Sequence, residues 1–236
     1  MAYQNPRYSI VIPAFNEQDN IPLLAEELRS VAETFLKDFE VIFVNDGSTD
    51  ATEQVLIGLE KKYSFLRHLT FPENRGQTSA FQAGFRAAQG AYVITMDCDL
   101  QNDPADIPRL LAKIESCDCV CGVRIKRQDN LLRRVSSVVA NTIRNVMTGD
   151  HITDVGCSLR IIKTDALRSV PLFNGLHRFL PTLLRWNGYV VCEVPVSHRP
   201  RTKGVSKYNV RNRLFKSLVD LCVVMWMKKN WIRSKT

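Results

Sequence analysis

Short apolar runs alternate with segments of helical spacing through the first half of the chain. The strand-like runs lie at residues 8–12, 40–44, 66–71 and 92–96. Apolar residues spaced three or four apart follow the first three runs, at 21–35, 52–63 and 77–88. This alternation predicts the α/β fold class, with a mostly parallel sheet joined by right-handed crossovers.

Polar side chains gather where these predicted strands end. The clusters are Asn16-Glu17, Asn45-Asp46, Asn74-Arg75 and Asp97-Cys98-Asp99. Ligands of parallel α/β sheets bind beyond the carboxyl ends of the strands. Four clusters on one predicted edge therefore indicate a binding site at that edge.

The second half of the chain is less regular, and we find no linker that divides it. Its patterns predict helices at 106–116, 131–147 and 178–186, and strands at 119–123, 158–162 and 189–196. We therefore predict one domain over residues 1–210, followed by an apolar and basic segment over 211–236.

The composition is that of a globular protein of 236 residues, with 45% hydrophobic and 24% charged residues. The net charge of +8 and the crowding of Lys and Arg in 198–235 favour an anionic partner. Nucleotide phosphates, acidic lipids and nucleic acid all meet that description. Because no basic surface interleaved with aromatic residues is visible, we expect no nucleic-acid partner.

Cysteine usage bears on the compartment. The chain has seven cysteines, and its first apolar run is too short for the core of a signal peptide. We therefore expect a reducing, cytoplasmic environment. Cys117, Cys119 and Cys121 alternate through a strand-like stretch, which predicts three packing cysteines on one face. A metal or redox role is the alternative, although the spacing is not that of a zinc site.

The acidic pair Asp97 and Asp99 is the strongest chemical signal. Residues two apart in an extended chain project to the same side, so both carboxylates can face one cation. Hard oxygen ligands with open positions suit Mg²⁺ or Mn²⁺ bound to a diphosphate, and Gln101 could add a neutral oxygen. A solvated acidic turn is the alternative. Neither a P-loop nor the glycine-rich dinucleotide fingerprint is present, which disfavours those nucleotide-binding classes.

Six motifs together resemble the inverting family 2 glycosyltransferases of GT-A fold, across roughly residues 7–225. They are Pro13-Ala14-Phe15-Asn16-Glu17, Val44-Asn45-Asp46-Gly47-Ser48-Thr49-Asp50, Asp97-Cys98-Asp99-Leu100-Gln101, Arg124, Asp154-Val155-Gly156-Cys157-Ser158-Leu159-Arg160 and Arg201-Thr202-Lys203-Gly204-Val205-Ser206-Lys207-Tyr208. The last string resembles the polyprenyl-phosphate branch, which includes dolichol-phosphate mannose synthases and bacterial undecaprenyl-phosphate glycosyltransferases.

The resemblance implies a role for each matching residue in binding a nucleotide-diphosphate sugar. The implied nucleoside pocket consists of Pro13, Phe15, Glu17, Val44 and Asp46. The implied metal and diphosphate site consists of Asp97, Asp99 and Gln101, with Cys98 contributing its backbone. Basic groups that close over the phosphates are implied at Arg124, Arg201 and Lys207.

The acceptor side is less specific. Arg133, Arg134 and Ser137 open a predicted helix and are candidates to hold an acceptor phosphate, although a charged helix start is the alternative. By resemblance Asp154 is the candidate base or acceptor-orienting residue, together with Asp99 and Arg124 in the catalytic set. A turn or capping aspartate is the alternative. His177 is a candidate for lining the sugar pocket, or else a structural histidine.

Residues 214–227 are strongly apolar but too short for a membrane span, which needs about 20 residues. Basic residues flank this run on both sides, and Trp226 and Trp231 lie at its end. The segment 211–236 is therefore predicted to form a helix in the interface of an acidic bilayer. A core helix with a basic end is the alternative. Membrane contact is expected to be peripheral or to depend on a membrane partner protein.

These observations favour a metal-dependent inverting glycosyltransferase that moves a sugar from a UDP- or GDP-sugar to a polyprenyl phosphate at the cytoplasmic membrane face. One competing hypothesis keeps the enzyme class but replaces the acceptor with another lipid or a saccharide. Another is a non-catalytic nucleotide-sugar binder, which would have no need of Asp97, Asp99 and the 201–207 motif together.

Overall fold

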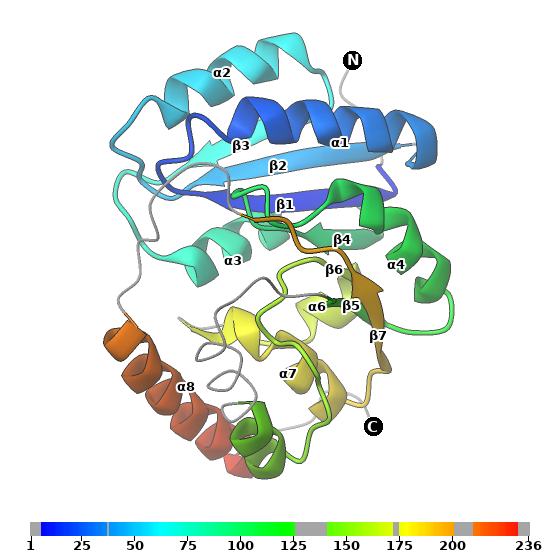
Figure 1. Cartoon of the computed structure of the whole chain (residues 1–236), viewed down its shortest axis with the longest axis vertical. Helices are drawn as coiled ribbons and strands as arrows, with labels where there is room; N and C mark the ends of the chain where they lie inside the picture. The colour runs from blue at the N-terminus through cyan, green and yellow to red at the C-terminus, as the bar shows by residue number, and fades with distance from the viewer. Residues whose placement is uncertain (1–5, 37, 126–140, 172–174, 201–209, 231–236) are drawn as a thin grey trace.

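A computed structural model of the chain shows an α/β fold built on one mixed sheet (Figure 1). The structure describes residues 6–36, 38–125, 141–171, 175–200 and 210–230, without the side chains of 210–218. Among these residues, seven strands pair in the order β3-β2-β1-β4-β6-β5-β7. Their bounds are β1 Tyr8–Ala14, β2 Phe39–Asn45, β3 Leu66–Thr70, β4 Tyr92–Thr95, β5 Cys119–Arg124, β6 Arg160–Lys163 and β7 Val191–Val196.

The first four strands are parallel, as the sequence predicts, and they place their carboxyl ends on one edge. In contrast, β6 runs antiparallel to both of its neighbours, β4 and β5. Its first residue, Arg160, pairs with Thr95 near the end of β4. The reversed direction of β6 therefore brings the segment that precedes it, residues 154–159, to the same edge as Asp97.

Helices cover both faces of the sheet (Figure 1). One apolar core lies under α1 Ile21–Phe35, α2 Thr52–Lys62 and α4 Ile107–Ile114, which follows the 3₁₀ turn η1 Pro104–Asp106. The other lies under α3 Gln77–Ala87, α6 Thr164–Arg168, α7 Leu180–Trp186 and α8 Val210–Asn230, with η2 Leu176–Arg178 before α7. Residues 141–148 are also helical.

Most predicted elements are confirmed, with shifts at their ends. β1 continues beyond the predicted 8–12 to Ala14, and Pro13 pairs with Val44 in the parallel register. The strand predicted at 158–162 begins only at Arg160, because Ser158 is used in contacts with the loop after β4. The helix predicted at 131–147 is present where it is described, from residue 141.

The prediction for the alternating cysteines is wrong for one of the three. Cys119 and Cys121 lie buried on the same face, with their sulfurs 3.7 Å apart, and pack as expected. Cys117 precedes β5 and belongs to the opposite core, where it forms a disulfide with Cys192 of β7. This pairing runs against the reducing environment expected from the sequence, in which disulfides are rare. The alternation was counted through residue 117, but extended strand geometry begins only at Cys119.

Candidate active site

The loops after β1 and β2 are fastened to each other by polar side chains. Asn16 adopts a left-handed conformation (φ 54°), and its backbone N–H donates to the Ser48 hydroxyl at 2.9 Å. Its side-chain oxygen accepts the Thr49 N–H at 2.7 Å. The Glu17 N–H donates to the Thr52 hydroxyl at 2.9 Å. These bonds fix the predicted nucleoside-binding motifs side by side at the carboxyl edge.

Asp46 fastens a third loop to the first two. Its carboxylate accepts the backbone N–H groups of Arg75 and Gly76, at 2.7 and 2.9 Å. Burial raises the pKa of this carboxyl, and these two hydrogen bonds oppose the rise. Gly47 has φ 66°, and a Cβ there would lie 2.3 Å from the Glu73 carbonyl carbon, so only glycine allows this approach.

The residues of the predicted nucleoside pocket differ in their exposure. Pro13, Phe15 and Glu17 are half-buried at the edge, where a ligand can reach them. Val44 is fully buried in the core on the α3 side, so its side chain packs there and does not line an accessible surface. The Cys98 side chain is likewise buried, in agreement with a role for its backbone alone.

Asp97 and Asp99 follow β4 in a tight turn. The Asp97 N–H donates to the Ser158 hydroxyl at 3.1 Å, and its carboxylate accepts the Gln77 amide at 2.8 Å. Leu100 has a left-handed backbone (φ 61°), which folds the chain so that the Asp99 carboxylate accepts the Gln101 N–H at 3.2 Å. The turn therefore holds both carboxylates at the carboxyl edge of the sheet.

The electrostatics of this pair suit a cation. The pKa of Asp97 is raised to about 6, first because the half-buried carboxyl is desolvated and second because the Asp99 carboxylate is close. The Ser158 hydrogen bond and the charges of Arg160 and Arg124 oppose the rise. Two crowded carboxylates are stabilised by a divalent cation, whose remaining ligands can come from phosphate oxygens. The donor set thus fits Mg²⁺ or Mn²⁺, although the described residues contain no cluster of three acidic, histidine or cysteine ligands.

Ser158 ties the turn together from the neighbouring strand segment. Its hydroxyl oxygen accepts the Asp97 N–H and also the side-chain amide of Asn102, at 2.7 Å. Its carbonyl accepts the Thr95 hydroxyl. Ser158 therefore holds both ends of the Asp97–Asn102 turn, a role that sequence reasoning missed because its partners lie 61 and 56 residues away.

Arg124 and Asp154 form a bidentate ion pair at the end of β5. The Arg124 Nε and Nη2 groups donate to the two Asp154 oxygens at 2.7 and 2.8 Å, and both side chains are largely buried. A Cβ at Gly156 would lie 2.7 Å from Arg124 Nη2, so the loop passes directly against the guanidinium. Sequence analysis placed both Arg124 and Asp154 among the candidate site residues, but it did not predict that they form an ion pair.

Five candidate residues lie outside the described part of the chain: Arg133, Arg134, Ser137, Arg201 and Lys207. The chain leading to 201 is described. The Arg199 N–H donates to the Gln101 carbonyl at 3.0 Å. The Arg199 side chain pairs with Glu27 and with Asp103. The segment before the 201–207 motif is therefore fixed beside the turn that carries Asp97 and Asp99.

Comparison with known proteins identifies the family. The family model "Glycosyl transferase family 2" matches residues 9–170. The chain belongs to glycosyl transferase family 2. It is 37% identical over 238 residues to the dodecaprenyl-phosphate galacturonate synthase of Rhizobium johnstonii, covering 96% of this chain and 68% of that protein.

Further relatives agree with family 2. The chain is 34% identical to the undecaprenyl-phosphate 4-deoxy-4-formamido-L-arabinose transferase of Salmonella choleraesuis, covering 91% of this chain and 66% of that protein. It thus spans about two thirds of the length of these relatives. The structure of glucosyl-3-phosphoglycerate synthase from Mycobacterium tuberculosis with Mn²⁺ and UDP-glucose superposes with TM-score 0.70 and 18% identity, over 92% of this chain and 79% of that one. The predicted GT-A fold and family are confirmed.

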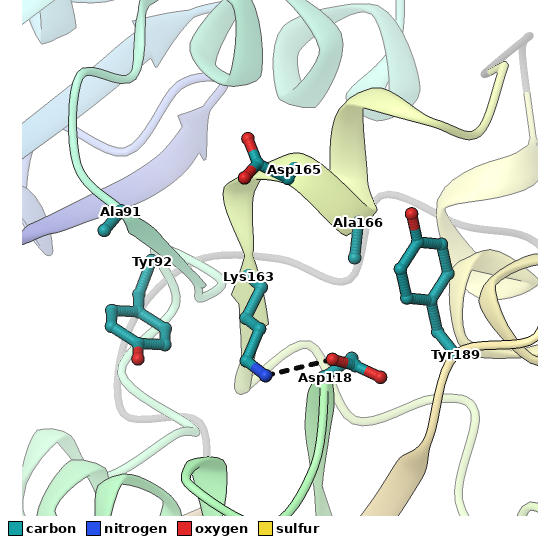
Figure 2. Close-up of a pocket in the computed structure, with 7 residues that line it drawn as sticks. All are labelled: Ala91, Tyr92, Asp118, Lys163, Asp165, Ala166 and Tyr189. Carbon is teal, nitrogen blue, oxygen red and sulfur yellow. Dashed lines mark hydrogen bonds and ion pairs between the residues drawn. The ribbon is translucent and has the colours of Figure 1, made fainter. Parts of the chain in front are cut away.

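A separate cavity of about 350 Å³ lies at the opposite edge of the sheet in this family 2 domain (Figure 2). It is lined by Ala91, Tyr92, Asp118, Lys163, Asp165, Ala166 and Tyr189. Tyr92 begins β4, whereas Asp97 follows its end. Lys163 donates to Asp118 across the cavity at 3.0 Å. The cavity is therefore distinct from the candidate active site.

Proposed function

We propose that this chain transfers a sugar, with inversion, from a nucleotide-diphosphate sugar to a polyprenyl phosphate. The observation that carries the proposal is the crowded pair Asp97 and Asp99 at the end of β4, beside the Arg124–Asp154 ion pair. The names of two relatives, a dodecaprenyl-phosphate and an undecaprenyl-phosphate sugar transferase, support this acceptor class.

The donor half of the site is proposed to hold Mg²⁺ or Mn²⁺ on Asp97, Asp99 and Gln101. When bound, such an ion stabilises the negative charge that develops on the departing nucleoside diphosphate. A solved structural neighbour contains Mn²⁺ together with UDP-glucose, which supports this assignment. Pro13, Phe15 and Glu17 are proposed to contact the nucleoside. Asp46 keeps acceptor capacity for it, because a carboxylate has about four lone-pair positions and two are used.

The acceptor half is proposed to rely on cations more than on a base. A phosphate monoester has a second pKa near 6, so at neutral pH it is largely ionised and nucleophilic. Asp154 accepts two charge-assisted hydrogen bonds from Arg124, an arrangement that favours an orienting role over a basic one. Arg124 would then face the phosphates with a fixed guanidinium. Arg133, Arg134, Ser137, Arg201 and Lys207 remain proposed phosphate ligands.

Membrane contact is proposed to be peripheral, at the cytoplasmic face, and to use the outer side of α8. No helix within the described ranges is long and apolar enough to cross a bilayer. Leu221, Val224 and Met227 pack into the core, whereas Trp226 is 67% exposed beside Lys228 and Lys229. The interface role is thus proposed for one face only, since the other face is that of a core helix.

The neighbouring helix 141–148 extends this surface. Lys228 donates to the Thr148 carbonyl at 2.9 Å, and Figure 1 shows the two helical segments side by side. Ile143, Val146 and Met147 are exposed on it, and Val146 is the most exposed of them at 78%. Apolar side chains next to lysines suit the headgroup region of an anionic membrane.

The decisive experiment is a transfer assay. A panel of UDP- and GDP-sugars would first be screened by thermal shift with Mn²⁺, and the selected donor then tested with undecaprenyl phosphate in detergent. Asp99→Ala should lower transfer by at least about a thousandfold while leaving the circular dichroism spectrum unchanged. Asp165→Ala, which removes a carboxylate at the opposite edge, should retain full activity. Near-normal transfer by Asp99→Ala would contradict the proposed metal site.

The same assay separates the competing acceptors. If the acceptor is another lipid or a saccharide, the donor will be bound and slowly hydrolysed, but undecaprenyl phosphate will not accelerate donor loss. Strict dependence on a membrane or detergent favours a lipid acceptor. Donor binding without any turnover would favour the non-catalytic alternative.

A further inference from the structure

Arg160 is a buried arginine whose guanidinium donates to two backbone carbonyls and whose charge also acts on Asp97. It begins β6, at the carboxyl edge of the sheet, and only 5% of the residue is exposed. Its Nη1 group donates to the His177 carbonyl at 2.7 Å and its Nη2 group to the Val155 carbonyl at 2.9 Å. Burying a guanidinium is costly, so its placement between two backbone segments calls for a reason.

The His177 side leads to the donor half of the site. The His177 ring nitrogen Nδ1 and the Thr78 hydroxyl lie 2.7 Å apart in a hydrogen bond. Thr78 follows Gln77 in the first turn of α3, and the Gln77 amide holds the Asp97 carboxylate at 2.8 Å. The Nη1 group of Arg160 is thus connected through His177 and α3 to Asp97, a proposed metal ligand.

The Val155 side leads to the acceptor half. Val155 is the neighbour of Asp154, whose carboxylate fixes both Arg124 nitrogens. The Gly156 N–H also donates to Asp154 at 3.2 Å, so residues 154–156 form one compact turn against Arg124. The Nη2 group of Arg160 therefore holds the turn whose Asp154 carboxylate orients the Arg124 guanidinium.

We infer that Arg160 is a positioning residue that sets the distance between the donor carboxylates and the Asp154–Arg124 pair. This inference rests on the proposed function and adds a component to it. A planar guanidinium with two parallel donors can fix two carbonyls at once, whereas a lysine ammonium binds as a point charge. Transfer requires the two reacting groups within a few tenths of an ångström of their productive geometry. Loss of the two Arg160 hydrogen bonds should therefore slow transfer without weakening the binding of donor or acceptor.

The test compares Arg160→Lys with Arg144→Lys. Arg144 is a matched control, since it is also 5% exposed and donates to a backbone carbonyl, that of Ile152, while its other described hydrogen bonds go to the side chains of Asn141 and Asn145. Arg160→Lys should lower kcat for transfer about tenfold to a hundredfold, with both KM values and the Kd for Mn²⁺ alone within about threefold of wild type. Arg144→Lys should lose thermal stability but keep kcat per folded molecule within about twofold.

Hydrolysis of the donor by water gives a readout of the donor half alone. It should stay within about threefold of wild type in Arg160→Lys while transfer falls. If Arg160→Lys does not fold, Thr78→Val breaks the same chain of contacts at the Thr78–His177 bond and should show the same selective loss of transfer.

Three outcomes would overturn the inference: unchanged kcat in the folded Arg160 or Thr78 variant, an equal loss in Arg144→Lys, or a parallel loss of Mn²⁺ binding. If wild type uses a saccharide in place of polyprenyl phosphate, the proposed acceptor is wrong. The ratio of transfer to hydrolysis with that saccharide still tests Arg160.

Discussion

Asp97 sits in a position where its own charge is costly without a cation. Its pKa of about 6 lies above that of an exposed aspartate, because the carboxyl is desolvated and Asp99 is close. The folded state therefore binds this proton more tightly than the unfolded state does. The group destabilises the metal-free fold most above about pH 6, and that cost disappears as the pH falls toward about 4.

We expect Asp97→Asn to raise the melting temperature of the metal-free protein at about pH 7.5, with the difference shrinking below about pH 6. Mn²⁺ at a hundred times its Kd should raise the melting temperature of wild type by about 5–10 °C at neutral pH, and much less at about pH 5. The variant should show no such rise. Differential scanning fluorimetry across this pH range measures both effects, and a Mn²⁺ shift that persists in Asp97→Asn would contradict the assignment.

Ser158 and Asn102 offer a second test of the same turn. Asn102→Ala removes the hydrogen bond that the Asn102 side-chain amide donates to the Ser158 hydroxyl at one end of the turn. Both carboxylates stay in place. We expect the Kd for Mn²⁺ to rise about tenfold, as is usual when groups that orient metal ligands are removed. Asn187→Ala, which removes a similarly buried amide bonded to Ser169, is the control and should leave Mn²⁺ binding unchanged. Isothermal titration of both variants decides the point.

The acidic pair could be predicted from sequence because its signal is local: two carboxylates separated by one residue after an apolar strand. Gln77 and Ser158 could not, since nothing near either residue marks it as a partner of Asp97. The bond between Arg124 and Asp154 also joins residues 30 positions apart. Such contacts depend on which strands are neighbours, and apolar periodicity does not specify that.

The same limit appears in the sheet. The periodicity of the first half correctly predicted parallel strands β1–β4, because each of the first three is followed by a helix long enough to cross over. β6 is only four residues long and antiparallel, and no local pattern reveals its direction. Yet that direction delivers Arg160, Ser158 and Asp154 to the active edge.

The helix α8 illustrates an ambiguity that sequence alone leaves open. Both predicted alternatives have support, because Leu221 and Val224 pack in the core while Trp226 and Val219 are exposed. We expect Trp226→Glu together with Val146→Glu to reduce binding to liposomes containing anionic lipid by at least about tenfold. Val190→Glu, at an exposed apolar position near the opposite cavity, should not change it. Flotation assays measure the binding, and equal binding by all variants would place the contact elsewhere.

The disulfide between Cys117 and Cys192 links two parts of the chain that are distant in sequence. It joins the segment before β5 to the edge strand β7 across 75 residues, and β7 leads directly to Arg199 and the turn beside Gln101. A disulfide that constrains the unfolded chain typically stabilises the fold by about 2–4 kcal/mol. The bond would therefore help to hold Arg199 beside the turn at Gln101, because it secures the strand that leads to Arg199.

Two observations test this role together. Cys192→Ser should unfold at lower denaturant concentration than wild type, by about 2–4 kcal/mol in the free energy of unfolding. Reductant should destabilise wild type by a similar amount and leave Cys192→Ser unaffected, whereas Cys222→Ser, at an exposed free cysteine, should respond as wild type does. If reductant has no effect on wild type, then the pairing of β5 with β7 through six residues is sufficient by itself to hold the edge strand, and the approach of Arg199 to Gln101 depends on the sheet alone.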